Sequence, residues 1–175
     1  FQDRRFVDII NNDLANTIGN LLNRTSSMSR KWFNNKTPSI SEKNNFEIQE
    51  YANNSIKNYL NYFDKYKLDK ASNEILYFAT NVNLYLNKKE PWTLIKDENN
   101  INEVKLIIYN VLEATRIIGV LLKPLLPEFS IKILNQLGEN DIDSRNWEES
   151  LKWGLLPKSN NLPKPKPIIN KLEYE

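Results

Sequence analysis

The sequence predicts an all-α protein, a bundle of about five helices that ends in an extended, proline-rich strap. The hydrophobic share of 40% and aromatic share of 11% supply enough apolar surface for a folded core. Only four glycines are present, which argues against a turn-dense all-β fold. Apolar residues recur every three or four positions over long segments that lack proline, as helices require. The 175 residues fit one domain, which we divide into a helical part, 1–156, and the strap, 157–175.

The first helix is expected over residues 6–33, a segment without proline. It should end near Asn34 and Asn35, because Pro38 cannot continue a helix. Its apolar face is expected to contain Leu14, Ile18, Leu21, Thr25, Met28 and Trp32.

Four further helices are expected over residues 43–68, 71–88, 101–122 and 128–137. Pro91 stops the third of these five helices, and a short turn at 92–96 leads toward the fourth. The fourth has an apolar face broad enough to be central in a bundle. Gly138 suits the C-terminal cap of the fifth. After residue 156, four prolines favour an extended strap: Pro157, Pro163, Pro165 and Pro167.

The composition excludes several classes of function. The chain contains no Cys and no His, which removes thiolate and imidazole catalysis and the usual zinc sites. Without Cys there are no disulfides, which is compatible with the cytoplasm, the expected location, or with an organellar stroma or matrix. No apolar run approaches the roughly 20 residues needed to cross a bilayer, so no membrane partner is expected. A net charge of +2 does not by itself indicate nucleic-acid binding.

One polar stripe on the first helix is a candidate binding surface. Asn16, Asn20 and Arg24 lie at i, i+4 and i+8 and should share one edge of the helix. Their amides and guanidinium could address the Watson–Crick edge of an unpaired base. On spacing alone, however, a solvated face explains this stripe better than a site does.

Trp92, in the sequence KEPW, is the second candidate. A Trp directly after a helix-ending proline can be a core anchor or an exposed platform on which a base stacks, and the sequence allows either. No comparable polar residues accompany the other three tryptophans, which we assign to packing: Trp32, Trp147 and Trp153.

Four stretches of the chain resemble the bacterial-type methionyl-tRNA synthetase family. They are NDLANTIGNLLNRT at 12–25, NKKEPW at 87–92, LKPLLP at 122–127 and the closing PKPIINKLE. Together they cover nearly the whole chain in the family's order. The first stretch occurs in related class I synthetases too, but its combination with EPW and the closing segment is fairly specific.

The resemblance implies an anticodon-binding helix bundle that binds the anticodon loop of methionine tRNA and recognises CAU. In the family, Asn and Arg one turn apart and the Trp after the Pro read the anticodon. These roles fall on Asn20, Arg24 and Trp92, with Asn16 in support and Pro91 positioning the Trp.

The resemblance also implies a catalytic domain in the same polypeptide that attaches methionine to tRNA with ATP and Mg. The two nucleotide-binding signatures of class I synthetases are absent from these 175 residues, so the chain alone is expected to be non-catalytic and to hold no cofactor. A monomer is expected, because the β-barrel with which some members dimerise is not seen. Two alternatives stay open: the equivalent domain of another class I synthetase, for Leu, Ile, Val or Cys, and a helical interaction module with no RNA role.

Overall fold

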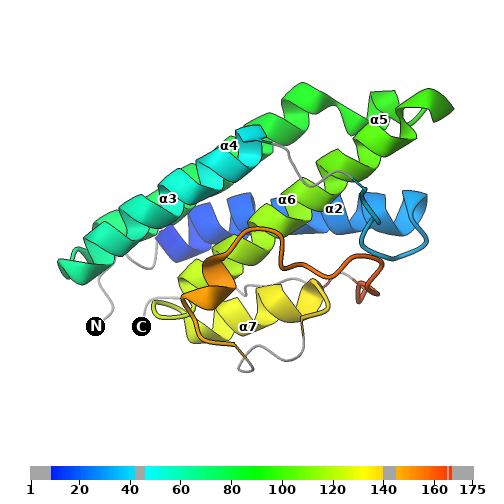
Figure 1. Cartoon of the computed structure of the whole chain (residues 1–175). Coiled ribbons are helices and arrows are strands. Elements are labelled where there is room, and N and C mark those ends of the chain that lie inside the picture. Colours follow the sequence, from blue (N-terminus) through cyan, green and yellow to red (C-terminus); the bar gives the residue numbers. More distant parts are fainter. Residues whose placement is uncertain (1–8, 42–45, 140–144, 165, 167–175) are drawn as a thin grey trace.

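The computed structural model describes residues 9–41, 46–139, 145–164 and 166, and this part of the chain is helical (Figure 1). Within these residues no strand forms, and the only β-type pairing is one antiparallel bridge between Lys36 and Asn161. The elements in chain order are the π-helix η1 (Ile9–Ile18), α2 (Gly19–Trp32), α3 (Phe46–Asp64), α4 (Leu68–Lys89), α5 (Pro91–Leu94), the 3₁₀-helix η2 (Glu98–Asn100), α6 (Ile101–Leu122), α7 (Pro127–Gln136) and the 3₁₀-helix η3 (Glu149–Leu151). The all-α prediction is therefore confirmed. None of the described helices is both long enough and apolar enough to cross a bilayer.

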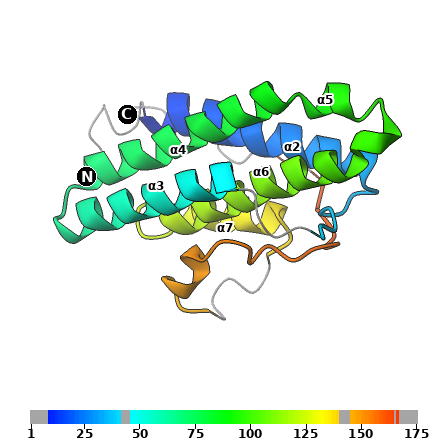
Figure 2. The same cartoon turned by 45° about the horizontal axis from the view of Figure 1, so that its top comes forward.

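Helix α6 is the centre of the bundle. It contacts α2, α3, α4 and α7, and these helices surround it in both views (Figures 1 and 2). Every residue from 107 to 122 is buried. A helix that is buried on all sides must be apolar nearly all round, and this confirms the expectation that the fourth predicted helix is the central one.

The first predicted helix differs from the expectation in its first half. Residues Ile9–Ile18 form a π-helix, and α-helical hydrogen bonding begins only at Gly19. The segment is rich in Asn and Ile, which are mediocre α-helix formers. It also packs on α4, where the Nδ2 of Asn83 donates to the carbonyl of Thr17 at 3.5 Å. Residues 6–8 of the prediction lie outside the described residues.

The turn between α3 and α4 lies earlier than expected. Helix α3 ends at Asp64 and α4 begins at Leu68, not at residues 68 and 71. Tyr66 adopts a left-handed conformation with φ 56°, and the N–H of Lys67 donates to the carbonyl of Tyr62 at 2.9 Å. No Gly, Pro or Asn marks this reversal, so the sequence offered no signal for its position. Residues 43–45 of the predicted helix lie outside the described residues.

The predicted ends of the last two helices agree closely with the structure. Helix α6 spans the expected residues, and α7 begins at Pro127, a favourable first position because its missing N–H would have no partner there. Gly138 follows α7 with φ 78°, the left-handed region that the cap requires.

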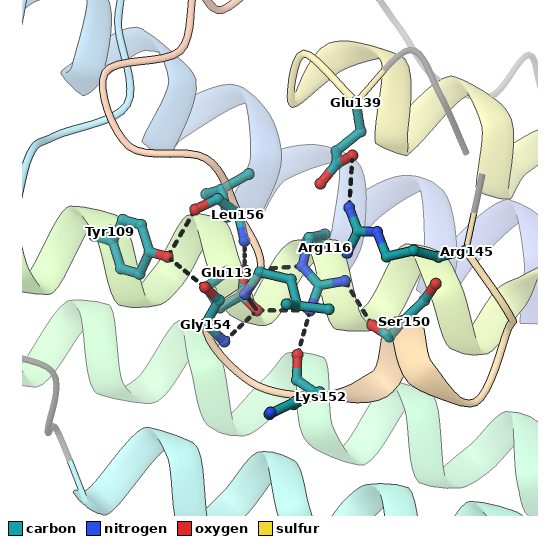
Figure 3. A network of polar contacts seen from close by, with 10 residues as sticks. Tyr109, Glu113, Arg116, Glu139, Arg145, Ser150, Lys152, Gly154 and Leu156 are labelled. Atoms are coloured by element: carbon teal, nitrogen blue, oxygen red, sulfur yellow. Dashed lines mark hydrogen bonds and ion pairs between the residues drawn. The ribbon is translucent and has the colours of Figure 1, made fainter. Parts of the chain in front are cut away.

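A buried ion pair on α6 holds the segment that follows α7 (Figure 3). Nη2 and Nε of Arg116 donate to the two carboxylate oxygens of Glu113 at 2.6 and 2.9 Å. The same guanidinium donates to the carbonyls of Ser150 at 2.6 Å and Lys152 at 2.8 Å. Both side chains of the pair are at most 2% exposed. The pair therefore fixes the backbone around η3 to the centre of the bundle.

The carboxylate of Glu113 also binds the next turn of this segment. It accepts hydrogen bonds from the backbone N–H groups of Gly154 at 2.9 Å, Leu155 at 3.3 Å and Leu156 at 3.0 Å. The hydroxyl of Tyr109 donates to the carbonyl of Leu156 at 2.8 Å. Burial, together with the nearby negative charge of Glu113, raises the pKa of Tyr109. Its phenol therefore stays a protonated donor.

The start of the predicted strap packs against the loop after α2. The Oγ1 of Thr37 donates to the carbonyl of Pro157 at 2.7 Å and accepts from the N–H of Asn160 at 2.8 Å. The N–H of Leu162 donates to the carbonyl of Asn35 at 2.9 Å. Residues 165 and 167–175 of the strap lie outside the described residues, and the division at residue 156 stays a prediction.

The three tryptophans assigned to packing are partly buried against the core, as expected. The indole of Trp147 packs on the rings of Tyr59 and Phe63, with both centroid separations at 6.2 Å. Its N–H donates to the carbonyl of Val120 at 2.8 Å.

Replacing Arg116 by Met should lower the free energy of unfolding by about 3–5 kcal/mol, because Glu113 would remain as an uncompensated buried charge. Urea unfolding followed by circular dichroism measures this loss. The control is Lys88→Met, which removes an exposed pair with Glu47 at 3.8 Å and should cost less than about 1 kcal/mol. Equal losses in the two variants would contradict the role of the buried pair.

Gly138→Ala should destabilise the fold more than Gly154→Ala. Both glycines have positive φ, at 78° and 92°, so each alanine costs about 1–2 kcal/mol of backbone strain. At Gly138 the added Cβ would also lie 2.6 Å from the carbonyl oxygen of Asn161, whereas nothing lies within 4 Å at Gly154. We expect roughly 1–3 kcal/mol of further loss from that overlap. The difference in urea midpoints between the variants tests the close approach of strap and α7.

Candidate functional site

The junction of α4 and α5 holds Trp92 at one end of α4. Glu90 ends α4 in a left-handed conformation with φ 48°, and Pro91 begins α5. The proline cannot continue α4 because it lacks an N–H and its ring clashes with the preceding turn. The N–H of Thr93 closes the new turn by donating to the carbonyl of Glu90 at 2.9 Å. Pro91 is buried, and α5 packs on α6, so the turn has a fixed base.

Trp92 is partly exposed, with 36% of its surface accessible. The other three tryptophans are partly buried against the core cluster, whereas Trp92 is not part of it. Of the two uses that the sequence allowed, the structure therefore disfavours the core anchor. Part of the indole surface is accessible to a planar ligand.

Arg24, on α2, lies against Trp92. Its guanidinium carbon is 5.5 Å from the centroid of the indole ring, which is within the range of a cation–π contact. Its Nη2 donates to the Oδ1 of Asn87, on α4, at 3.1 Å. Three elements, α2, α4 and α5, thus each contribute one side chain to a single cluster of Arg24, Asn87 and Trp92, here called the Arg–Trp cluster.

Asn20 and Asn16 are exposed and make no side-chain hydrogen bond to a described residue. Asn20 lies one turn before Arg24 on the same α-helix, so these two side chains share an edge, as the spacing predicts. Asn16 belongs to η1, where hydrogen bonds run from i to i+5. The change of helix type at Gly19 means that the regular i, i+4, i+8 register does not extend to Asn16.

Asn87 is the member of the cluster that sequence reasoning missed as a site residue. It lies four positions before Pro91, in the NKKEPW stretch, and it is exposed. The signal that could have identified it is its position in this stretch, which resembles the family. Because the contact joins residues 63 positions apart, spacing along one helix could not reveal it.

The Arg–Trp cluster, together with Asn20 one turn before Arg24, suits a flat polar ligand. The indole offers a π-face, the guanidinium offers a fork of donors, and the amides of Asn20 and Asn87 offer both donors and acceptors. Aromatic rings, Arg planes and amides of this kind bind splayed, unpaired bases. No group of three or more His, Cys, Asp or Glu side chains suited to a metal ion occurs among the residues that the structure describes.

Comparison with known proteins places the chain in a family. A family model described as the anticodon binding domain of methionyl tRNA ligase matches residues 36–175. A methionine–tRNA ligase of Caldanaerobacter subterraneus is 33% identical over 177 residues, and one of Listeria monocytogenes is 34% identical over 179. Both alignments cover 100% of this chain and 27% of the relative, so the chain spans about a quarter of their length.

Solved structures agree. The apo form of Mycobacterium tuberculosis methionyl-tRNA synthetase superimposes with a TM-score of 0.85 at 26% identity, over 100% of this chain and 36% of that one. The same enzyme in complex with methionyl-adenylate gives a TM-score of 0.82 at 28% identity, over 96% of this chain and 33% of that one. The match of the family model over most of the residues, together with these relatives, decides the assignment: the chain belongs to the family of anticodon-binding domains of methionyl-tRNA ligases.

Proposed function

We propose that the chain binds the anticodon loop of methionine tRNA and recognises its CAU triplet through Asn20, Arg24 and Trp92. In this proposal it acts within a complete, monomeric ligase whose catalytic domain attaches methionine to the tRNA with ATP and Mg. The observation that carries it is the contact between the Arg24 guanidinium and the partly exposed Trp92 ring, at 5.5 Å. Family membership supplies the class of ligand, and the cluster supplies the chemistry.

Trp92 provides the stacking surface for one splayed base of the loop. Pro91 and the hydrogen-bonded α4–α5 turn position its backbone, and a preorganised platform of this kind favours affinity. Stacking of a base on an aromatic side chain is worth about 1–3 kcal/mol. Arg24 already lies near the indole, so base, indole and guanidinium can associate without a rearrangement of the backbone.

Arg24 and Asn20 distinguish cytosine from uracil at the first anticodon position. Donors of the guanidinium meet O2 and N3 of cytosine, and an Asn side-chain oxygen accepts from its exocyclic amine. Uracil presents a donor at N3 and an acceptor in place of the amine, so both contacts would be mismatched. The hydrogen bond from Arg24 to Asn87 orients the guanidinium. Asn16, in η1, has a supporting role in binding.

Two alternatives are less well supported. The equivalent domain of another class I synthetase disagrees with relatives that are methionine–tRNA ligases. An interaction module without RNA leaves the exposed indole and the guanidinium beside it unexplained. The experiment that separates them is footprinting of methionine tRNA. Salt-dependent protection of the anticodon loop would exclude the interaction module, because such a module would give no protection.

Trp92→Ala or Arg24→Ala in the complete ligase should reduce kcat/KM for charging methionine tRNA. Loss of stacking alone predicts a decrease of roughly 10- to 100-fold. Methionine-dependent ATP–pyrophosphate exchange should stay nearly unchanged, since the Arg–Trp cluster has no part in activation. Arg30→Ala is the matched control, because Arg30 is an exposed arginine on the same helix and lies outside the cluster. Equal charging rates in Trp92→Ala and the parent would refute the site.

Asn87→Ala should weaken discrimination more than affinity. It removes the acceptor that orients Arg24 and leaves both the guanidinium and the indole in place. We expect at most about a tenfold loss in charging, as for one exposed hydrogen bond worth up to about 1.5 kcal/mol. The ratio of kcat/KM for tRNAs with C or U at the first anticodon position should fall as well. An unchanged ratio would show that Asn87 does not orient Arg24.

A further inference from the structure

Glu90, the residue between α4 and α5, has an unfavourable backbone conformation. Its φ of 48° and ψ of 56° lie in the left-handed region, where a residue that ends a helix is usually glycine or asparagine. The other non-glycine residues of the described chain with positive φ are asparagine, tyrosine and serine, so Glu90 is the only charged residue among them. The turn itself therefore gives no reason for a glutamate at this position.

The charge of Glu90 is also unfavourable at the end of α4. The last carbonyl groups of a helix carry partial negative charge, so cations stabilise this end and anions destabilise it. Lys88 and Lys89, in the last turn of α4, follow this rule, whereas Glu90 does not. Glu90 also precedes α5, but that helix has only four residues, and the Glu90 side chain forms no capping hydrogen bond to it. Neither helix thus explains the carboxylate.

The carboxylate of Glu90 is available to a ligand. Glu90 is exposed, and its side chain forms no hydrogen bond or ion pair with a residue that the structure describes. The two lysines before it contact other groups. The Nζ of Lys88 lies 3.8 Å from the Oε1 of Glu47, and the Nζ of Lys89 lies 5.7 Å from the centroid of the Tyr85 ring. An unpaired acceptor with a full negative charge therefore remains at this turn.

Glu90 belongs to the same turn as Trp92 of the Arg–Trp cluster. It follows Asn87 by three residues and precedes the tryptophan by two. Its carbonyl accepts hydrogen bonds from the N–H groups of Thr93 at 2.9 Å and Leu94 at 3.2 Å. These bonds fix the backbone of Glu90 relative to that of Trp92, so the free carboxylate and the accessible indole are presented by one rigid turn.

We propose that Glu90 is a further specificity-determining residue of the anticodon site, one that accepts a hydrogen bond from the exocyclic amine of cytosine and repels O4 of uracil. The inference rests on the proposed function. The amine carries two protons, so Asn20 can accept one and Glu90 the other. Acceptors at O2 and N3 of cytosine complement the positive Arg24, and the amine complements the negative carboxylate. Because a carboxylate can only accept, it cannot bond to O4 of uracil.

The first test is Glu90→Gln in the complete ligase, charged with methionine tRNA that has C or U at the first anticodon position. Glutamine keeps the shape of the side chain but adds an N–H donor for O4 of uracil. The kcat/KM for the U-containing tRNA should rise about tenfold, and that for the C-containing tRNA should change by less than about threefold. The matched control is Glu98→Gln, an exposed glutamate of η2 outside the Arg–Trp cluster. A C-to-U ratio of kcat/KM in Glu90→Gln equal to that of the parent overturns the proposal.

Glu90→Gly separates a role in specificity from a role in the fold. Glycine adopts the left-handed conformation without strain and removes the negative charge from the end of α4. The melting temperature of the 175-residue chain should therefore rise by about 2–4 °C. In the complete ligase the same variant should lower the C-to-U ratio of kcat/KM. A higher melting temperature with an unchanged ratio would show that Glu90 affects stability alone, and the proposal would fail.

Comparison with Trp92→Ala distinguishes failure of this inference from failure of the proposed function. If Trp92→Ala lowers charging and Glu90→Gln leaves the C-to-U ratio unchanged, the anticodon site stands and only the role of Glu90 is wrong. If Trp92→Ala charges as well as the parent, the anticodon site and the role of Glu90 both fail. A loss of charging in Trp92→Ala together with a lower ratio in Glu90→Gln is the result that we expect.

Discussion

The buried pair of Glu113 and Arg116 is the constraint on which the rest of this structure depends. Two charges in the middle of the central helix are tolerated only because each is neutralised by the other and saturated by backbone groups. Those backbone groups belong to residues 150–156, so the same interactions that satisfy the charges attach an irregular segment to the bundle. An apolar replacement could fill the volume, but it could not offer the acceptors that Gly154 and Leu156 need.

The packing of helices on α6 has consequences at the proposed anticodon site. The turn that carries Trp92 rests on α6 through α5, and α2, which carries Arg24, packs on the same helix. The relative position of indole and guanidinium is therefore set by packing in the core and not by the loop alone. A preorganised surface of this kind binds a ligand with little further loss of conformational entropy.

Much of the fold could be predicted from patterns along the chain, and the failures have physical causes. Pro91, Pro127 and Gly138 mark helix ends that agree with the structure within one residue, because their backbone preferences are local. The reversal at Tyr66 was displaced by several residues, since a tyrosine in a left-handed conformation gives no sequence signal. The π-helical start of the first helix was missed as well. Apolar residues every three or four positions predict α-helical turns, and nothing in this spacing distinguishes the first ten residues of the helix from the rest.

For the candidate site, too, some features could be predicted from the sequence and others depend on how the helices pack. The sequence by itself determined the helical class, the central helix and the presence of Arg24 and Trp92 in stretches that resemble one family. These depend on composition, local propensity and residue identity. Only the tertiary structure decided that Trp92 is accessible, that Arg24 lies beside it, and that Asn87 completes the cluster across 63 positions of sequence. Only it also decided that the Glu113–Arg116 pair is buried and holds residues 150–156. These are distances between elements that are remote in sequence, and they are set by how the helices pack on α6.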